Sequence, residues 1–141
     1  MKKLNLPFIS KRYTGFTIPK GGAFYICDHD AVWLITLGQE PIVHETDLNP
    51  YKFVDGHTDF LGLNFEGLEE NPPLLRVGEN VIAYDFNPGS NQVIVKYAVA
   101  GRSGQIEFPI FSQHWFCASF SDDSCHLILA EPDRVEIYEA A

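Results

Sequence analysis

The stretch NVIAYDFNPGSNQVIVKYAV, residues 80–99, decides the fold class of this 141-residue chain. Two runs rich in Val, Ile and Tyr, residues 80–86 and 92–99, flank a five-residue segment, 87–91, that contains Pro and Gly. β-Branched and aromatic residues favour strands, and Pro and Gly between two such runs are typical of a turn. The stretch therefore predicts a β-hairpin.

Short apolar runs separated by turn residues continue through the rest of the chain. They lie at residues 24–27, 32–37, 41–45, 60–65, 105–111, 114–120, 125–130 and 134–139. A spacing of roughly 9–13 residues between strands is the one expected of all-β sandwiches and barrels. No linker rich in Pro, Gly or Ser divides the chain. We therefore expect a single all-β domain over residues 1–141, a sandwich or barrel of nine to eleven short, mostly antiparallel strands joined as hairpins and meanders.

Three segments support more specific structural predictions. A single helical turn is expected over residues 49–54, where Pro50 takes the first helical position. The continuous apolar run VWLITL, residues 32–37, predicts a strand buried on both faces, or nearly so. Residues 134–139 alternate charged and apolar side chains, which is typical of a sheet edge protected by charge. If this last strand is not an edge, pairing with a second subunit is the alternative, and a homodimer is left open.

Charge is distributed unevenly along the chain. The sequence contains 10 basic and 19 acidic residues, for a net charge of −9, yet residues 1–20 contain five basic residues and no acidic one. The acidic excess in residues 21–141 repels phosphates and so argues against a nucleic-acid ligand. Apolar residues interleave with the basic ones in residues 1–20, so we expect this segment to lie on the acidic body rather than to extend from it as a solvated arm.

The chain has no recognisable membrane or export signal. The apolar run at residues 4–9 is short and interrupted by Asn5 and Pro7, unlike a secretory signal. No run approaches the length of a membrane span. The three cysteines, Cys27, Cys117 and Cys125, show no metal-ligand spacing and fit a reducing compartment. These features predict a cytoplasmic protein with no cofactor and no membrane contact.

One short motif has the residue types of a metal site. In the sequence DGHTD, residues 55–59, an extended strand would place Asp55, His57 and Asp59 on one face. Carboxylates and an imidazole on one face are suitable ligands for a divalent metal, which makes a metal-assisted hydrolase one hypothesis. A plain turn is the competing interpretation of the same residues.

The aromatic residues support a second alternative. Trp33 and Trp115 lie inside predicted strands, where they either belong to the core or line a pocket between sheets. A small-molecule or carbohydrate ligand is the hypothesis that such a pocket supports.

The acidic turns support the leading hypothesis. Turns gather at the ends of a sandwich, so acidic turns predict an acidic rim that would steer a basic protein toward it. This pattern indicates a non-enzymatic interaction module of the immunity-protein or inhibitor kind. A hairpin turn alone is the simpler interpretation of residues 28–30. The candidate partner-binding residues are Asp28, Asp30, Glu69, Glu70, Asp122 and Asp123.

Overall fold

The computed structural model describes residues 1–7, 9–56, 59–62, 72–87, 89–111 and 114–140. The predicted all-β class is confirmed, with thirteen strands among these residues where nine to eleven were expected. The three strands that the sequence pattern missed span only two or three residues, too few to show an alternating pattern. The strands are β1 (Lys2–Leu4), β2 (Gly15–Thr17), β3 (Ala23–Cys27), β4 (Val32–Thr36), β5 (Ile42–Glu45), β6 (Phe60–Gly62), β7 (Arg76–Val77), β8 (Asn80–Ala83), β9 (Gln92–Val99), β10 (Arg102–Pro109), β11 (Cys117–Phe120), β12 (His126–Glu131) and β13 (Arg134–Glu139).

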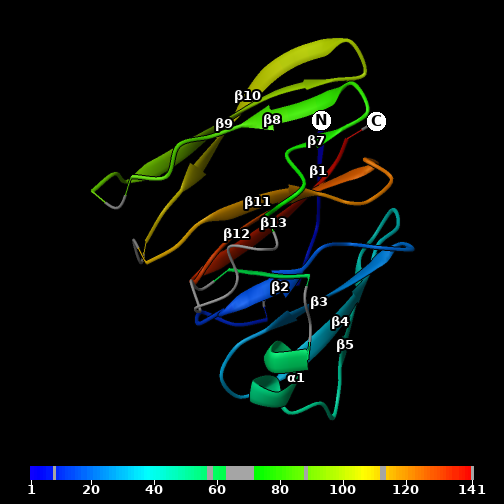
Figure 1. The fold of residues 1–141 in the computed structure, drawn as a ribbon, viewed down its shortest axis with the longest axis vertical. Helices are drawn as coiled ribbons and strands as arrows, with labels where there is room; N and C mark the ends of the chain where they lie inside the picture. Colours follow the sequence, from blue (N-terminus) through cyan, green and yellow to red (C-terminus); the bar gives the residue numbers. More distant parts are fainter. Residues whose placement is uncertain (8, 57–58, 63–71, 88, 112–113, 141) are drawn as a thin grey trace.

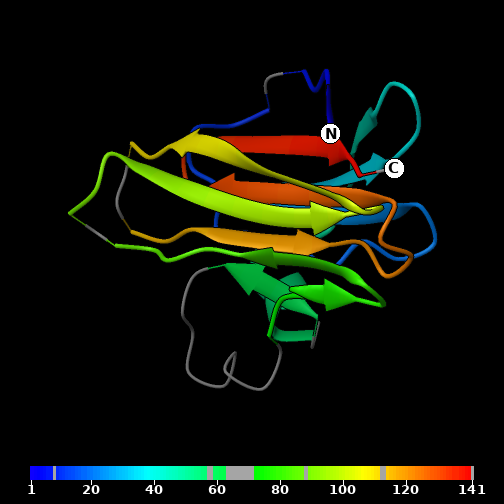
Figure 2. The same cartoon turned by 90° about the horizontal axis from the view of Figure 1, so that it is seen from above.

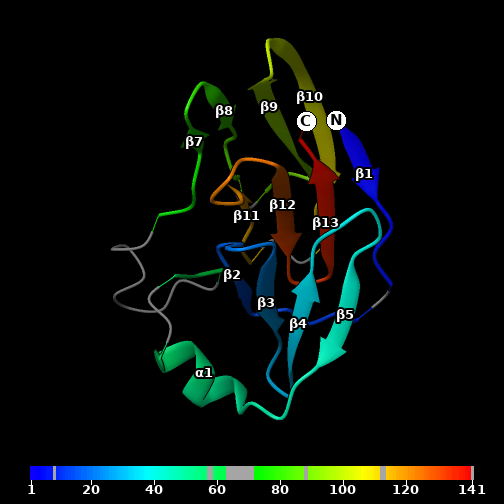
Figure 3. The same cartoon turned by 90° about the vertical axis from the view of Figure 1, so that its right-hand side faces the viewer.

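The strands form three antiparallel sheets stacked as layers (Figure 1). The middle sheet has the order β1-β13-β12-β11. The meander sheet, β10-β9-β8-β7, covers one of its faces, and the N-terminal sheet, β5-β4-β3-β2-β6, covers the other. Two separate hydrophobic cores fill the two spaces between the layers. The short helix α1 (Pro50–Gly56) lies on the outer side of the N-terminal sheet, where Phe53 packs against Phe60 (Figures 1 and 3).

β12 is the strand that is buried on both faces. Ile128 and Ala130 contribute to the core shared with the N-terminal sheet, and Leu127 and Leu129 contribute to the core shared with the meander sheet. The burial on both faces, or nearly so, that was predicted for residues 32–37 is met only in part: Val32 and Ile35 are fully buried, but β4 belongs to an outer layer that α1 covers only in part. Trp33 and Leu34 are accordingly half-buried, and Thr36 is exposed.

The hairpin predicted from residues 80–99 is confirmed. β8 and β9 pair antiparallel, with Ile82 opposite Tyr97, although β8 ends at Ala83 and the connection is longer than five residues. The turn between β9 and β10 consists of Ala100 and Gly101, whose φ angles are 52° and 76°. Two successive residues with positive φ form the two-residue hairpin turn whose backbone twist matches that of the flanking strands. β10 therefore begins at Arg102, directly after this turn.

β13 is an internal strand, which corrects the prediction of a sheet edge at residues 134–139. β1 pairs with it, placing Lys2 opposite Glu139 and bringing the two ends of the chain to the same end of the middle sheet (Figure 2). Two charged residues of this strand, Arg134 and Glu136, form an ion cluster with Lys3 of β1, in which the carboxylate is buried and the two cations are partly exposed. At its centre, the side chain of Glu136 is only 5% exposed and binds Lys3 and Arg134.

Candidate binding surface

Three of the five basic residues in residues 1–20 bind carboxylates of the acidic body. Leu4 and Phe16 of the same segment are buried in the core between the middle and N-terminal sheets. Opposite charges and apolar contacts therefore hold residues 1–20 against the rest of the chain. The ion pairs are Lys3–Glu136 (N–O 2.8 Å), Arg12–Asp30 (3.0 Å) and Lys20–Asp59 (3.6 Å).

The four predicted partner-binding carboxylates that the structure describes lie at opposite ends of the stack and do not share one rim. Asp28 and Asp30 follow the end of β3 in the β3–β4 turn. Asp122 and Asp123 occupy the β11–β12 turn, where the Asp122 N–H donates to the carbonyl of Pro19, just before β3 begins (Figure 1). The two remaining candidates, Glu69 and Glu70, lie outside the described residues.

Asp28 supports its own turn and is not accessible to a partner. It is 6% exposed, and its Oδ1 accepts hydrogen bonds from the backbone N–H groups of Asp30 (2.7 Å) and Ala31 (2.9 Å). Its Oδ2 accepts a hydrogen bond from Ser10 Oγ (2.8 Å). The structure thus supports the turn interpretation of residues 28–30, since both oxygens are used internally.

Asp123 has a similar local role but remains exposed. It accepts hydrogen bonds from Ser121 Oγ (2.6 Å) and the Cys125 N–H (2.9 Å), and these bonds lower the pKa of the Asp123 carboxyl. Asp30 and Asp122 are also exposed, and Asp30 is engaged by Arg12.

Asp55, the first residue of the candidate metal site, lies in a helix rather than in a strand. Asp55 is an exposed residue of α1, which begins at Pro50 as the sequence predicts and is capped by Asn49, whose Oδ1 accepts the Tyr51 N–H (3.0 Å). His57 lies outside the described residues, and Asp59 binds Lys20. Within the described ranges, no three His, Cys, Asp or Glu side chains form a group suited to a metal ion.

The two tryptophans differ in accessibility. Trp115 is 6% exposed within the core, and its Nε1 has no hydrogen-bond partner in the part of the chain that the structure describes. Trp33 is half-buried on β4, directly opposite Glu45 of the neighbouring strand. Trp33 also packs against the core between the middle and N-terminal sheets, so a partner can reach only the exposed part of its ring.

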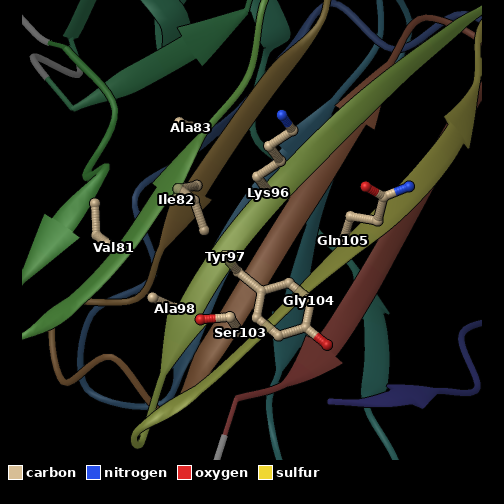
Figure 4. A pocket seen from close by; sticks show the side chains of 9 residues that line it. All are labelled: Val81, Ile82, Ala83, Lys96, Tyr97, Ala98, Ser103, Gly104 and Gln105. Carbon is tan, nitrogen blue, oxygen red and sulfur yellow. The ribbon is translucent and has the colours of Figure 1, made fainter.

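A hollow of about 510 Å³ lies on the meander sheet, away from both tryptophans (Figure 4). It is open to solvent and mostly apolar, and strands β8, β9 and β10 line it. Tyr97 extends across Gly104, where an added Cβ would lie 2.4 Å from the tyrosine oxygen. This hollow is thus a shallow feature of one sheet and differs from the aromatic pocket between sheets that the sequence led us to consider.

Charge segregation between sheets is the feature that the sequence analysis missed. Residues 21–51, which include β3, β4 and β5, contain five acidic residues and no Lys or Arg. Residues 76–109, the meander sheet, contain three basic and three acidic residues. Counting charge over strand-sized segments reveals this difference, whereas the net charge of the whole body conceals it.

The strand β5 forms an exposed edge of the N-terminal sheet. The Thr46 N–H donates to the Val32 carbonyl (2.9 Å), so even-numbered residues of this strand direct their backbone groups toward β4. The N–H and C=O groups of Val43 and Glu45 consequently point to the open edge. Ile42 on the same strand is 66% exposed.

Three exposed carboxylates surround this strand: Glu40 and Asp47 flank it, and Glu45 belongs to it. None of them takes part in an ion pair with another described residue. We call β5 together with these three carboxylates the acidic edge. It combines unpaired backbone groups, an exposed apolar side chain and uncompensated negative charge.

Comparisons with protein-family models, curated proteins and solved structures found no match. No helix among the described residues has the length and apolar character needed to cross a membrane.

Proposed function

We propose that this chain is a non-enzymatic protein-interaction module that binds a basic, extended segment of a protein partner along the acidic edge. The observation that supports this most directly is the combination of a free strand edge at β5 with three exposed carboxylates in a region without Lys or Arg. An extended peptide that adds to a sheet edge gains affinity from main-chain hydrogen bonds. Basic side chains on that peptide would also be steered by the negative field.

Trp33 gives this surface a further means of recognition. It is half-buried on the strand next to β5, and its cross-strand neighbour is Glu45. An arginine of the partner would stack on the indole ring while pairing with the carboxylate, since cation–π contacts favour Trp and Arg. Protection of a basic protein by an inhibitor of this kind is the form of interaction that the charge profile fits.

We place this interaction in the cytoplasm. Cys27, Cys117 and Cys125 are all free thiols, and free cysteines fit a reducing compartment. Burial raises the pKa of the Cys117 thiol to about 12, so this thiol is unreactive in the folded protein.

The test is a fluorescence-anisotropy titration with a labelled peptide of alternating lysine and valine, compared with a peptide of alternating glutamate and valine. The basic peptide is expected to bind, and its affinity is expected to fall as salt is raised, because exposed charges are screened. The acidic-edge variant Glu40→Gln/Glu45→Gln/Asp47→Asn is expected to weaken binding about tenfold, from roughly 0.5 kcal/mol for each exposed charge.

A matched control separates the acidic edge from net charge alone. Glu79→Gln/Asp85→Asn/Asp122→Asn removes the same three charges from exposed positions outside residues 21–51. The proposal predicts a much smaller loss of affinity for this control than for the acidic-edge variant. Equal losses in both variants, or affinity that does not depend on salt, would contradict it.

A further inference from the structure

β10 is the longest edge strand among the described strands. The other edge strands, β1, β5, β6, β7 and β11, contain two to four residues each, whereas β10 contains eight. The edge of β11 is also covered, because the Phe120 N–H donates to the Leu74 carbonyl (2.9 Å) and the Ala118 N–H donates to Tyr84 Oη (3.2 Å). A long edge without such cover presents a template for pairing with another chain.

The register of the β9–β10 hairpin determines which backbone groups of β10 are available. Val99 and Arg102 close the two-residue turn as a hydrogen-bonded pair, and the Ile110 N–H donates to the Asn91 carbonyl (2.9 Å). Even-numbered residues therefore direct their backbone groups toward β9. The open edge presents the N–H and C=O groups of three exposed residues: Ser103, Gln105 and Glu107.

The charge of the meander sheet allows two copies of this acidic chain to approach one another. Residues 76–109 have no net charge, since Arg76, Lys96 and Arg102 balance Glu79, Asp85 and Glu107. The rest of the chain accounts for the entire net charge of −9. Contact between two meander sheets therefore avoids the repulsion that contact through the acidic edge would produce.

We propose that two copies of this chain pair β10 with β10, antiparallel, about a two-fold axis at Gln105. This arrangement joins two four-stranded meander sheets into one continuous sheet. Ser103 of each copy then lies opposite Glu107 of the other, where the hydroxyl can donate to the carboxylate, and Gln105 lies opposite itself. The same surface patch is used by both copies, as two-fold symmetry requires.

Neighbouring registers are less favourable. If the two-fold axis moves toward Pro109, Pro109, which has no backbone N–H, enters the ladder, and at an axis on Glu107 the two Glu107 carboxylates also lie opposite each other. A shift toward the β9–β10 turn removes the pairs that involve Glu107. The central register is the one that uses all three edge-facing residues without opposing like charges.

Sedimentation equilibrium over roughly 1 to 200 μM chain tests this proposal, because a strand–strand contact is smaller than a standard interface and micromolar affinity is expected. The wild-type chain is expected to dimerise in this range. Gln105→Pro removes an N–H that faces the open edge and leaves the β9 ladder intact, so it is expected to remain monomeric throughout.

A charge pair at Ser103 tests the register itself. Ser103→Lys places a lysine opposite Glu107 twice by symmetry and is expected to tighten the dimer about fivefold, whereas Ser103→Glu is expected to weaken it by a similar factor. The controls Gln39→Lys and Gln39→Glu make the same changes of net charge in the exposed β4–β5 turn and are expected to behave nearly as the wild type does.

The outcomes are decisive even if Gln105→Pro does not fold, because the Ser103 variants leave the backbone unchanged. Opposite effects of Lys and Glu at position 103, absent at position 39, support the proposal. A wild-type chain that remains monomeric at the highest concentration overturns it. Equal dimerisation of folded Gln105→Pro and wild type, or effects of the same sign at position 103, also overturns it.

Discussion

The substitution Glu136→Gln tests how the two ends of the chain are held together. Glu136 is a buried carboxylate of β13, and its Oε1 lies 2.8 Å from Lys3 Nζ of β1 and 2.5 Å from an Arg134 guanidinium nitrogen. Its Oε2 accepts a hydrogen bond from Tyr138 Oη (3.0 Å). Glutamine has nearly the same shape but lacks the charge, so the variant removes the attraction without opening a cavity.

The magnitude follows from how exposed the two cations are. A hydrogen bond to a charged group contributes about 1.5–3 kcal/mol when both partners are buried. The Lys3 and Arg134 side chains are 51% and 34% exposed, so water recovers much of this energy in the variant. We therefore expect a loss of about 2 kcal/mol in the free energy of unfolding, or about 6 °C in Tm.

The effect has a defined dependence on pH. Burial by itself raises the pKa of Glu136, but hydrogen bonds from Lys3 and Tyr138, together with the charges of Arg134 and Lys3, hold it below its ordinary value of 4.5. Because the pKa is lower in the folded state than in the unfolded state, the stabilisation is complete above that value and is lost as pH falls through the folded pKa.

Urea denaturation of wild type, Glu136→Gln and Lys3→Met at pH 7 and at about pH 3 measures these differences. At pH 7, Lys3→Met is expected to lose less than Glu136→Gln, since it removes only one half-exposed partner. The difference between wild type and Glu136→Gln is expected to shrink at the lower pH. A loss of equal size at both pH values, or a larger loss in Lys3→Met, would refute the reasoning.

Three further predictions concern local structure. Gly62→Ala is expected to lower the free energy of unfolding, measured by chemical denaturation, by about 3 kcal/mol, because the φ of Gly62 is 139° and an added Cβ would lie 2.5 Å from a backbone oxygen. Gly38→Ala, where an added Cβ meets no atom within 4 Å, should change stability little, and equal effects of the two substitutions would contradict this. Asp28→Ala is expected to lower the free energy of unfolding by about 2 kcal/mol, because two backbone N–H groups lose their acceptor, while Asp122→Ala leaves stability nearly unchanged. If Asp28→Ala does not change stability, Asp28 becomes a surface candidate again. Cys125 should react first with a thiol reagent, because it is exposed whereas Cys27 and Cys117 are buried, with pKa values raised by that burial to about 11 and 12. Equal rates for all three thiols would show that the cores open readily.

Local patterns in the sequence were sufficient to predict the elements that depend on local chemistry. Alternating β-branched residues around a Pro-Gly segment predicted the β8–β9 hairpin, and Pro50 predicted the start of α1. The side chain of Asn49 caps the start of that helix, and the buried side chain of Phe53 packs it against the sheet. The helix in turn explains why Asp55 is not in an extended strand.

The layered arrangement depends on contacts between distant parts of the chain, which no local pattern encodes. Lys3 meets Glu136 across 133 residues of sequence, and this pairing turns β13 from an edge into an internal strand. β4 and β12 are both apolar runs, but only β12 lies in the middle layer. The sequence cannot distinguish them, because burial on a second face depends on which sheet arrives there.

The candidate partner-binding residues show the same limit. An aspartate in a turn has the same sequence signature whether it faces solvent or accepts backbone hydrogen bonds, so Asp28 could not be separated from Asp30. The acidic edge, in contrast, was accessible to sequence analysis through the absence of Lys and Arg from residues 21–51. Its relevance became clear only when β5 proved to be the edge of its sheet.

Residue-resolved hydrogen exchange, with and without the lysine–valine peptide, tests the central claim most directly. The backbone N–H groups of Val43 and Glu45 point to the open edge of β5, so they should exchange rapidly in the free protein and slowly in the complex. The edge-facing N–H groups of Ser103 and Gln105 on β10 should show no added protection at a protein concentration too low for self-association. Protection confined to Asp122 and its turn, or no protection at Val43 and Glu45 in a peptide-saturated sample, would contradict binding along the acidic edge.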